Sequence, residues 1–300
     1  MRDNSGRLVA LPLCRGGEFC AIHAKPFVAR PANPETSLVI VYLDLETTGV
    51  DVAQDRIVEL AASHAPADHR LAGGSYSTTV RVDPQILKER GTEAAAVHGI
   101  SDAEIAQGPN FVEAWTRFLL WTEALLNTSI QEDVWDSDDD EPRAPRLEET
   151  PVLLLAAHNG ARASVCLTYL CERVDRVRAH MPKLSRFKAR FDFPLLLCEV
   201  MRHDLSCAPF ERWLFVDTLA ALHSVHRHAC MKLQCLSLRI MADTGRAHRA
   251  LDDCVSLRQV VAAAALVLGV SASTFLKHFA QEVDLPSSRA QISVLMDPGK

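Results

Sequence analysis

The sequence predicts an α/β protein built on a mixed five-stranded sheet flanked by helices, and three observations lead to this fold class. Three short β-rich runs follow one another at 38–46, 56–65 and 76–82, with turn residues between them, as in an antiparallel meander. Two all-apolar runs of the buried-strand type come later, at 151–159 and 213–218. Helical patterns then alternate with these runs. A change from adjacent strands to strand–helix alternation is typical of a mixed sheet packed between helices.

The predicted helices begin after the meander. Asn110 and Glu113 have the spacing of a capping box, and apolar residues then recur at helical spacing in FVEAWTRFLLWTEALL. A second helical segment opens at Phe191, and a long final helix is predicted over 248–268. These helices supply the layers that the sheet needs on its faces.

The domain boundaries follow from composition. Residues 1–36 lack periodicity and end in the turn-rich run RPANPET, which indicates a poorly ordered extension. A transit peptide is the alternative, favoured by the scarcity of acids but opposed by Asp3 and by sparse serine. We expect one folded domain over 37–270 and a C-terminal extension over 271–300.

Composition indicates a globular, intracellular protein of the cytoplasm or nucleus, with organellar targeting as the weaker alternative. The chain has 300 residues, of which 48% are hydrophobic and 23% charged. Its longest apolar run, 260–270, is shorter than the roughly 20 residues of a membrane-spanning helix. Nine cysteines without CxxC spacing indicate reduced thiols. Cys14, Cys20 and His23 resemble part of a zinc site but lack a clear fourth ligand.

The net charge of −6 is concentrated in one segment. Residues 131–149 hold nine acids and two arginines, so the rest of the chain is close to neutral. We expect this segment to be a disordered, solvated loop. A near-neutral body is compatible with a nucleic-acid substrate, because the local field of a cleft governs phosphate attraction.

The motif with the clearest chemistry is Asp44-Leu45-Glu46-Thr47-Thr48-Gly49, at the end of the first predicted strand. Side chains two apart on a strand point to the same face, so the two acids project together. Paired carboxylates repel one another unless something positive neutralises them. Oxygen ligands favour Mg²⁺ or Mn²⁺. For this pair alone, the alternative to a metal site is a solvent-exposed strand end in which one acid caps the following helix.

Three further motifs occur in a consistent order. His158-Asn159-Gly160 follows the predicted buried strand 152–157, Phe191-Asp192 opens a later helix, and His248 precedes Asp252 and Asp253 at the start of the last helix. Together with DLETTG, this set resembles the DnaQ-like DEDDh exonucleases, and the run HNG…RFDFPLL looks most like their three-prime repair exonuclease branch. The resemblance covers about residues 38–266.

The resemblance implies an RNase H-like exonuclease domain with two metal ions, Mg²⁺ or Mn²⁺, held by Asp44, Glu46, Asp192 and Asp253. It implies His248 as the general base, a role that suits a side chain with a pKa near neutrality. The metal ions would activate the attacking water and neutralise developing charge. The remaining expected contacts are with the terminal nucleotide; these substrate-binding residues are Leu45, Thr47, Thr48, Gly49, His158 and Asn159.

One metal ligand is ambiguous on spacing. Asp252 lies four residues after His248 and Asp253 lies five, and on a regular helix the four-residue spacing gives the closer alignment. The family pattern selects Asp253. The spacing argument lapses if the helix begins after His248.

The sequence departs from the family pattern between Asn159 and Asp192. Removing residues 163–190 would join HNGAR to FDFPLLL and restore an uninterrupted motif. The basic insertion is interpreted in three ways: a helix that grips nucleic acid, a bland surface insertion of low entropic cost, or non-native sequence such as a translated intron.

The function expected is a metal-dependent 3′→5′ exonuclease that removes mononucleotides from nucleic-acid 3′ ends. The resemblance favours DNA repair, single-stranded or frayed DNA ends, no membrane and a homodimer. RNA 3′-end trimming is the nearest alternative. A nucleic-acid-binding protein without catalysis follows if the insertion separates Asp192 from the other acids, and a structural protein on the same fold is the third alternative.

Overall fold

The computed structural model describes residues 9–10, 25–26, 38–52, 54–64, 74–132, 151–158, 192–226, 230–241 and 249–282. Several expectations fall outside these ranges. They concern the order of most of the 1–36 extension, the Cys14–Cys20–His23 group, the acidic loop after Glu132, the insertion 163–190, and the residues Asn159 and His248.

The sheet confirms the predicted α/β architecture, a mixed sheet flanked by helices. Its order is β5-β4-β3-β6-β7-β8. The strands β3, β4 and β5 pair antiparallel as the predicted meander, β6 and β7 continue the sheet in parallel with β3, and β8 pairs antiparallel with β7. The strand bounds are β3 Leu38–Thr47, β4 Ile57–His64, β5 Ser75–Thr79, β6 Val152–Ala157, β7 Leu214–Asp217 and β8 Gln281–Glu282. A separate two-stranded pair is formed by β1 Val9–Ala10 and β2 Lys25–Pro26.

The structure differs from the sequence prediction in the number of strands and in the start of the last long helix. The sheet has a sixth member, β8, which at two residues carries too little pattern to be predicted. The final long helix begins at Ala250 rather than at residue 248, with Arg249 in extended conformation at its N-cap. The helix that follows the meander is preceded by an N-cap bond of the expected kind, in which the Glu113 amide donates to Asn110 Oδ1 at 2.9 Å.

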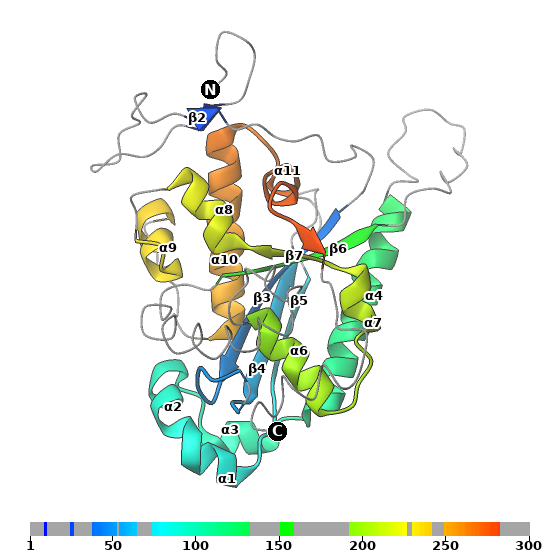
Figure 1. The fold of residues 1–300 in the computed structure, drawn as a ribbon, viewed down its shortest axis with the longest axis vertical. Helices are drawn as coiled ribbons and strands as arrows, with labels where there is room; N and C mark the ends of the chain where they lie inside the picture. Colours follow the sequence, from blue (N-terminus) through cyan, green and yellow to red (C-terminus); the bar gives the residue numbers. More distant parts are fainter. Residues whose placement is uncertain are drawn as a thin grey trace, which may run out of the picture.

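Helices cover both faces of the sheet (Figure 1). Between β5 and β6 lie α1 Pro84–Ile86, the π-helical η2 Leu87–Gly91, α2 Thr92–His98, α3 Asp102–Gln107 and α4 Phe111–Glu132. After β6 come α6 Asp192–Arg202, α7 Ala208–Arg212, α8 Thr218–Val225, α9 Leu233–Met241, α10 Ala250–Leu268 and α11 Ala272–Lys277.

The core is divided by the sheet into two apolar layers. Odd-numbered residues of β3, such as Leu43 and Leu45, pack with Phe118 of α4 and Phe193 of α6. Even-numbered residues, such as Tyr42, pack with α8, α9, α10 and α11. The period of two along β3 therefore decides which side chains meet α10.

The segment after residue 270 packs onto the same body. Phe275 and Leu276 of α11 are fully buried in the layer that contains α10, and β8 extends the sheet. The boundary at 270 stays a prediction, while the packing shows that residues 272–282 contribute to the core and sheet.

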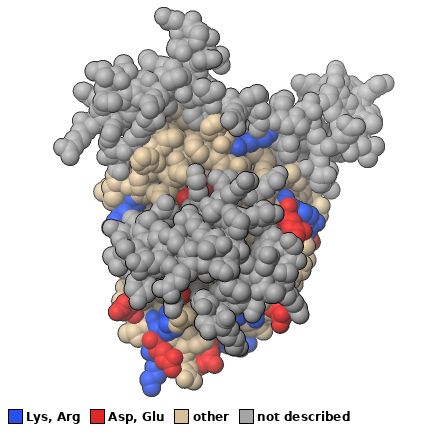
Figure 2. All heavy atoms as spheres, in the orientation of Figure 1, with Lys and Arg blue, Asp and Glu red and all other residues tan. Residues whose placement is uncertain are grey.

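On the side seen in Figure 2, Lys and Arg side chains lie among Asp and Glu. No helix in the described part of the chain is long and apolar enough to cross a membrane.

Candidate metal centre

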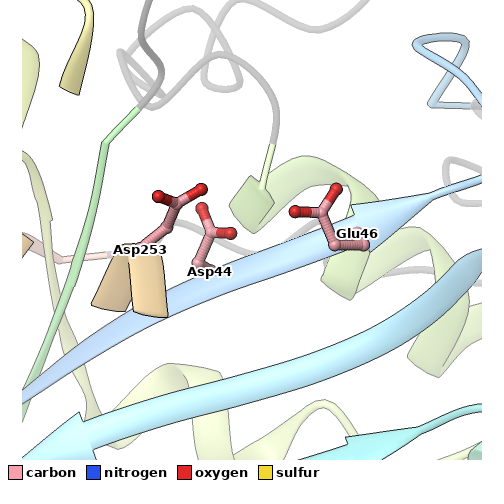
Figure 3. Close-up of side chains that lie close together, drawn as sticks. All are labelled: Asp44, Glu46 and Asp253. Carbon is pink, nitrogen blue, oxygen red and sulfur yellow. The ribbon is translucent and has the colours of Figure 1, made fainter. Parts of the chain in front are cut away.

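The carboxyl half of β3 presents two acids on the face that α10 covers. Leu43 and Leu45 point into the opposite layer and are nearly inaccessible, so the alternation of the strand sends Asp44 and Glu46 to the other side. Both acids are partly buried. Figure 3 shows the two carboxylates rising from the same side of the β3 ribbon.

The third acid of the cluster comes from the first turn of α10. One carboxylate oxygen each from Asp44, Glu46 and Asp253 lie within 4.8 Å of one another. Asp253 is 9% exposed, and its side chain points to that of Asp44 (Figure 3). The neighbouring Asp252 is half-buried and lies outside this group. Because α10 begins at Ala250, the four-residue spacing from residue 248 is not a regular helical spacing, which removes the argument for Asp252.

Asp192 is the first residue of α6 and lies next to the cluster without belonging to the 4.8 Å group. It is 4% exposed. Burial raises its pKa to about 7, and the nearby charge of Asp217 at the end of β7 adds to this shift. Among neighbouring charges, that of Asp192 is the largest influence raising the pKa of Asp44. Asp192 therefore extends the field of the acidic cluster.

The acids strongly oppose one another's ionisation. Burial raises the pKa of Asp44 well above its ordinary value, and Asp192, Asp253, Glu46 and Glu59 raise it further. The pKa of Glu46 is raised to about 8, mainly by burial and next by the negative charge of Asp253. Within the described residues, neither Asp44 nor Glu46 forms a salt bridge.

This arrangement fits a divalent cation. Three converging carboxylates supply the oxygen ligands that Mg²⁺ and Mn²⁺ prefer. A bound cation would also remove the repulsion that keeps these groups from ionising together. The donor set and its electrostatics agree with the metal ligands expected from the sequence, and the number and identity of the ions belong to the proposal below.

The loop after β3 is fixed by buried polar contacts. The Thr48 hydroxyl donates to Asp55 Oδ1 at 3.0 Å and accepts from the Arg56 amide at 3.0 Å. Asp55, which is 2% exposed, also accepts from the Asp51 amide at 2.7 Å and from Arg90 Nε at 2.7 Å. The loop therefore has a defined conformation before any ligand arrives.

Glycine at position 49 is required by the same contacts. A Cβ atom there would lie 2.6 Å from Asp55 Oδ2, closer than side chains tolerate. Thr47 donates its hydroxyl to the Gly49 carbonyl at 2.6 Å. The residues Thr47, Thr48 and Gly49 thus form a tight turn at the edge of the acidic cluster, and their predicted contact with a nucleotide stays a prediction.

The other two described residues expected to bind substrate are buried. Leu45 is 6% exposed and packs in the layer beneath α6. His158, at the end of β6, is 7% exposed and uses both ring nitrogens within the protein. Its Nε2 donates to the Met231 carbonyl at 2.8 Å, and its Nδ1 lies 3.0 Å from the Thr218 hydroxyl. These contacts favour a role for His158 in joining β6 to α8 and to the segment before α9.

Three acids near the site were not singled out by the sequence analysis: Asp55, Glu59 and Asp217. Asp55 fixes the loop, Asp217 lies beside Asp192, and Glu59 faces the start of α10. For Glu59 the sequence does contain a signal, because a single acid inside the apolar run IVELAAS is unusual for a buried strand.

Comparison with known proteins shows that the segment holding the first part of the site is similar to an exonuclease family model. The family model RNase_T, described as Exonuclease, matches residues 41–130. The matched segment includes Asp44, Glu46 and the loop after them.

A curated relative agrees with this match. A "DNA polymerase III subunit epsilon-like protein" from Rhodobacter capsulatus is 32% identical over 115 residues, which cover 38% of this chain and 14% of that protein. The chain therefore matches about one seventh of its relative's length. Among solved structures, cell-death related nuclease 4 matches with a TM-score of 0.44 and 15% identity, covering 77% of this chain and 64% of the other.

Proposed function

We propose that this protein is a divalent-cation-dependent 3′→5′ exonuclease that releases mononucleotides from DNA 3′ ends. The observation that carries the proposal is the convergence of Asp44, Glu46 and Asp253, three carboxylates from two distant parts of the chain. The exonuclease match over residues 41–130 supports the hydrolytic class.

The proposed site uses two Mg²⁺ or Mn²⁺ ions, with Asp192 as the fourth carboxylate. Such ions lower the pKa of a bound water and neutralise charge on the phosphate and the leaving oxygen. Asp192 lies close enough to raise the pKa of Asp44, which supports its place in the ligand set. The four acids then ionise together only when cations are present.

His248 is proposed as the base that takes the proton of the attacking water. It directly precedes Arg249, the N-cap of the helix that carries Asp253. A histidine near its ordinary pKa can accept this proton at neutral pH and pass it to solvent. The turn at Thr47–Gly49 is proposed to hold the terminal nucleotide through its backbone, since the Thr48 hydroxyl is used by Asp55.

The likeness of the HNG…RFDFPLL run to the three-prime repair branch supports DNA as substrate, a role in repair and a homodimeric assembly. The experiment compares matched DNA and RNA oligonucleotides, each labelled at its 5′ end in one set and its 3′ end in another. We expect the 3′ label to be released at once as a mononucleotide, the 5′-labelled strand to shorten stepwise, and DNA to be degraded faster than RNA.

Three outcomes would overturn parts of this proposal. Cleavage that continues in EDTA would exclude the metal mechanism. Faster degradation of RNA would replace the DNA assignment by RNA 3′-end trimming. Tight binding of both oligonucleotides without cleavage, in the presence of Mg²⁺ or Mn²⁺, would indicate a nucleic-acid-binding protein instead of an enzyme.

A further inference from the structure

Glu59 is a buried acid that the proposed chemistry does not use. It lies on β4 directly opposite Glu46 of β3, and it is 2% exposed. Its neighbours along the strand, Val58 and Leu60, are fully buried apolar residues. Those two side chains point to the opposite face of the sheet, and the Glu59 carboxylate, shielded from water, is costly unless each oxygen is hydrogen bonded.

Both oxygens of Glu59 are used at the start of α10. Oε2 accepts from the Ala250 amide at 3.0 Å, and Oε1 accepts from Arg249 Nη2 at 3.0 Å. Arg249 stands at the N-cap but makes no side-chain capping bond of its own. Glu59 therefore supplies the acceptor that a local capping residue would otherwise provide, from a strand 191 residues away.

The first turn of α10 joins these contacts to the acidic cluster. The Asp253 amide donates to the Arg249 carbonyl at 3.0 Å. Arg249 is therefore hydrogen bonded both to Glu59 and to the backbone of Asp253. The carboxylate of Asp253 then reaches those of Asp44 and Glu46. A shift of the helix start would move Asp253 away from β3.

We propose that Glu59 is a positioning residue that fixes the first turn of α10 on β4 and so holds Asp253 in register with Asp44 and Glu46. This inference rests on the proposed metal site. It assigns Glu59 no contact with substrate or cation.

Glu59 has an electrostatic cost that its contacts offset. Its negative charge raises the pKa of both Asp44 and Glu46, so it adds repulsion to an acidic cluster. The Arg249 guanidinium lowers the pKa of Glu46 and partly compensates. A charge-assisted clamp on a helix N-terminus, where the dipole also favours an anion, is the benefit that balances this cost.

The test compares Glu59→Ala, Glu59→Gln and the control Ser63→Ala in the full chain. Ser63 is also buried on β4 and also contacts α10, through Arg258 Nη1 at 3.2 Å, but five residues beyond Asp253. Gln keeps one oxygen that can accept from the Ala250 amide, but it loses the charge and the second oxygen, which accepts from Arg249. Three quantities are measured: Mn²⁺ affinity by electron paramagnetic resonance, amide hydrogen exchange at residues 250–253, and kcat and KM.

We expect Glu59→Ala to weaken Mn²⁺ binding about 10- to 100-fold, the usual effect of removing a partner that orients a metal ligand. Exchange at residues 250–253 should accelerate, and kcat should fall on the order of 10²-fold with KM little changed, because a displacement of about 1 Å is enough for such a loss. Glu59→Gln should recover at least half of the lost Mn²⁺ binding energy. Ser63→Ala should lower stability without changing Mn²⁺ affinity.

Wild-type Mn²⁺ affinity and exchange in Glu59→Ala would overturn the positioning role, and so would equal losses in Ser63→Ala. If Glu59→Ala does not fold, Mn²⁺ affinity and amide exchange at residues 250–253 are measured in Glu59→Gln instead. Weaker Mn²⁺ binding and faster exchange than in the wild type support the positioning role, and wild-type values for both overturn it. A wild-type protein that binds Mn²⁺ but cleaves nothing would refute the nuclease function alone, since affinity and exchange still test Glu59.

Discussion

Glu46 on β3 and Glu59 on β4 lie directly opposite each other across an antiparallel strand pair. Two carboxylates at one register position repel unless one is bound elsewhere and the other meets a cation or a proton. Glu59 is bound to Arg249 and Ala250, which leaves Glu46 as the group that a cation must satisfy. The following predictions test the site that results.

Metal-free protein should lose stability as the pH rises. The pKa of Glu46 is raised from 4.5 to about 8, so between these values the folded chain holds a proton that the unfolded chain has released. The folded state then binds more protons, and the free energy of unfolding falls with increasing pH. We expect the Tm in EDTA to decrease from pH 5 to pH 8. Glu46→Gln should flatten this slope, whereas Glu123→Gln on the exposed face of α4 should leave it unchanged.

Asp253→Asn and Asp252→Asn form a matched pair on adjacent positions of α10. Asp253 belongs to the acidic cluster and Asp252 does not. We expect Asp253→Asn to lower kcat/KM by at least about 10²-fold, since even outer partners of metal ligands contribute 10- to 100-fold. Asp252→Asn should stay within a few-fold of wild type. The reverse order in an oligonucleotide cleavage assay would reassign the ligand to Asp252.

His248→Ala should lose rate by a factor on the order of 10² to 10⁴ with little change in KM, which is the usual contribution of a positioned general base. His223→Ala, at an exposed position of α8, is the control and should keep full activity. Single-turnover cleavage at neutral pH measures both variants. An unchanged rate in His248→Ala would remove this residue from the mechanism.

Gly49→Ala should destabilise the loop after β3, because the new Cβ atom would meet Asp55 Oδ2 at 2.6 Å. Overpacking of this kind costs about 1–3 kcal/mol. In Gly91→Ala the nearest atom, Leu87 Cδ2, is at an ordinary 3.5 Å, so that variant should be as stable as wild type or more so. Denaturant unfolding compares the two. Equal stabilities would show that Asp55 does not fix the loop as the hydrogen bonds indicate.

Deleting residues 163–190 should give a folded protein with exonuclease activity at least equal to that of the full chain. The deletion restores HNGARFDFPLLL in sequence register. Thermal melting and cleavage of a labelled oligonucleotide measure the effect. A deletion variant that folds equally well but binds and cuts DNA much more weakly would favour the insertion as an element that grips substrate.

Much of the fold follows from patterns that are local in the sequence. The alternation in 38–47 predicts the strand and the common face of Asp44 and Glu46, and Asn110 marks the start of α4. The short helices between 84 and 107 escape such prediction, because three to seven residues hold less than two turns of apolar periodicity. The start of α10 at Ala250 depends on Glu59, and no local pattern contains that contact.

The acids of the site also divide into those that a local sequence pattern predicts and those that only long-range contacts reveal. The spacing of Asp44 and Glu46 predicts their convergence, whereas the choice of Asp253 over Asp252 needs the position where the helix begins. Asp55 and Glu59 act through partners 35 and 190 residues away in the sequence. Their roles therefore appear only when the chain is folded.

The contact between Glu59 and Ala250 links the order of synthesis to the assembly of the site. A ribosome makes β4 long before α10, so the nascent chain carries the Glu59 carboxylate without the amide and guanidinium that satisfy it. Until α10 docks, Glu59 lacks these two partners beside Asp44 and Glu46 of β3, which disfavours burial of this face of the sheet. The proposed metal site is thus complete only after α10 has docked on β3 and β4.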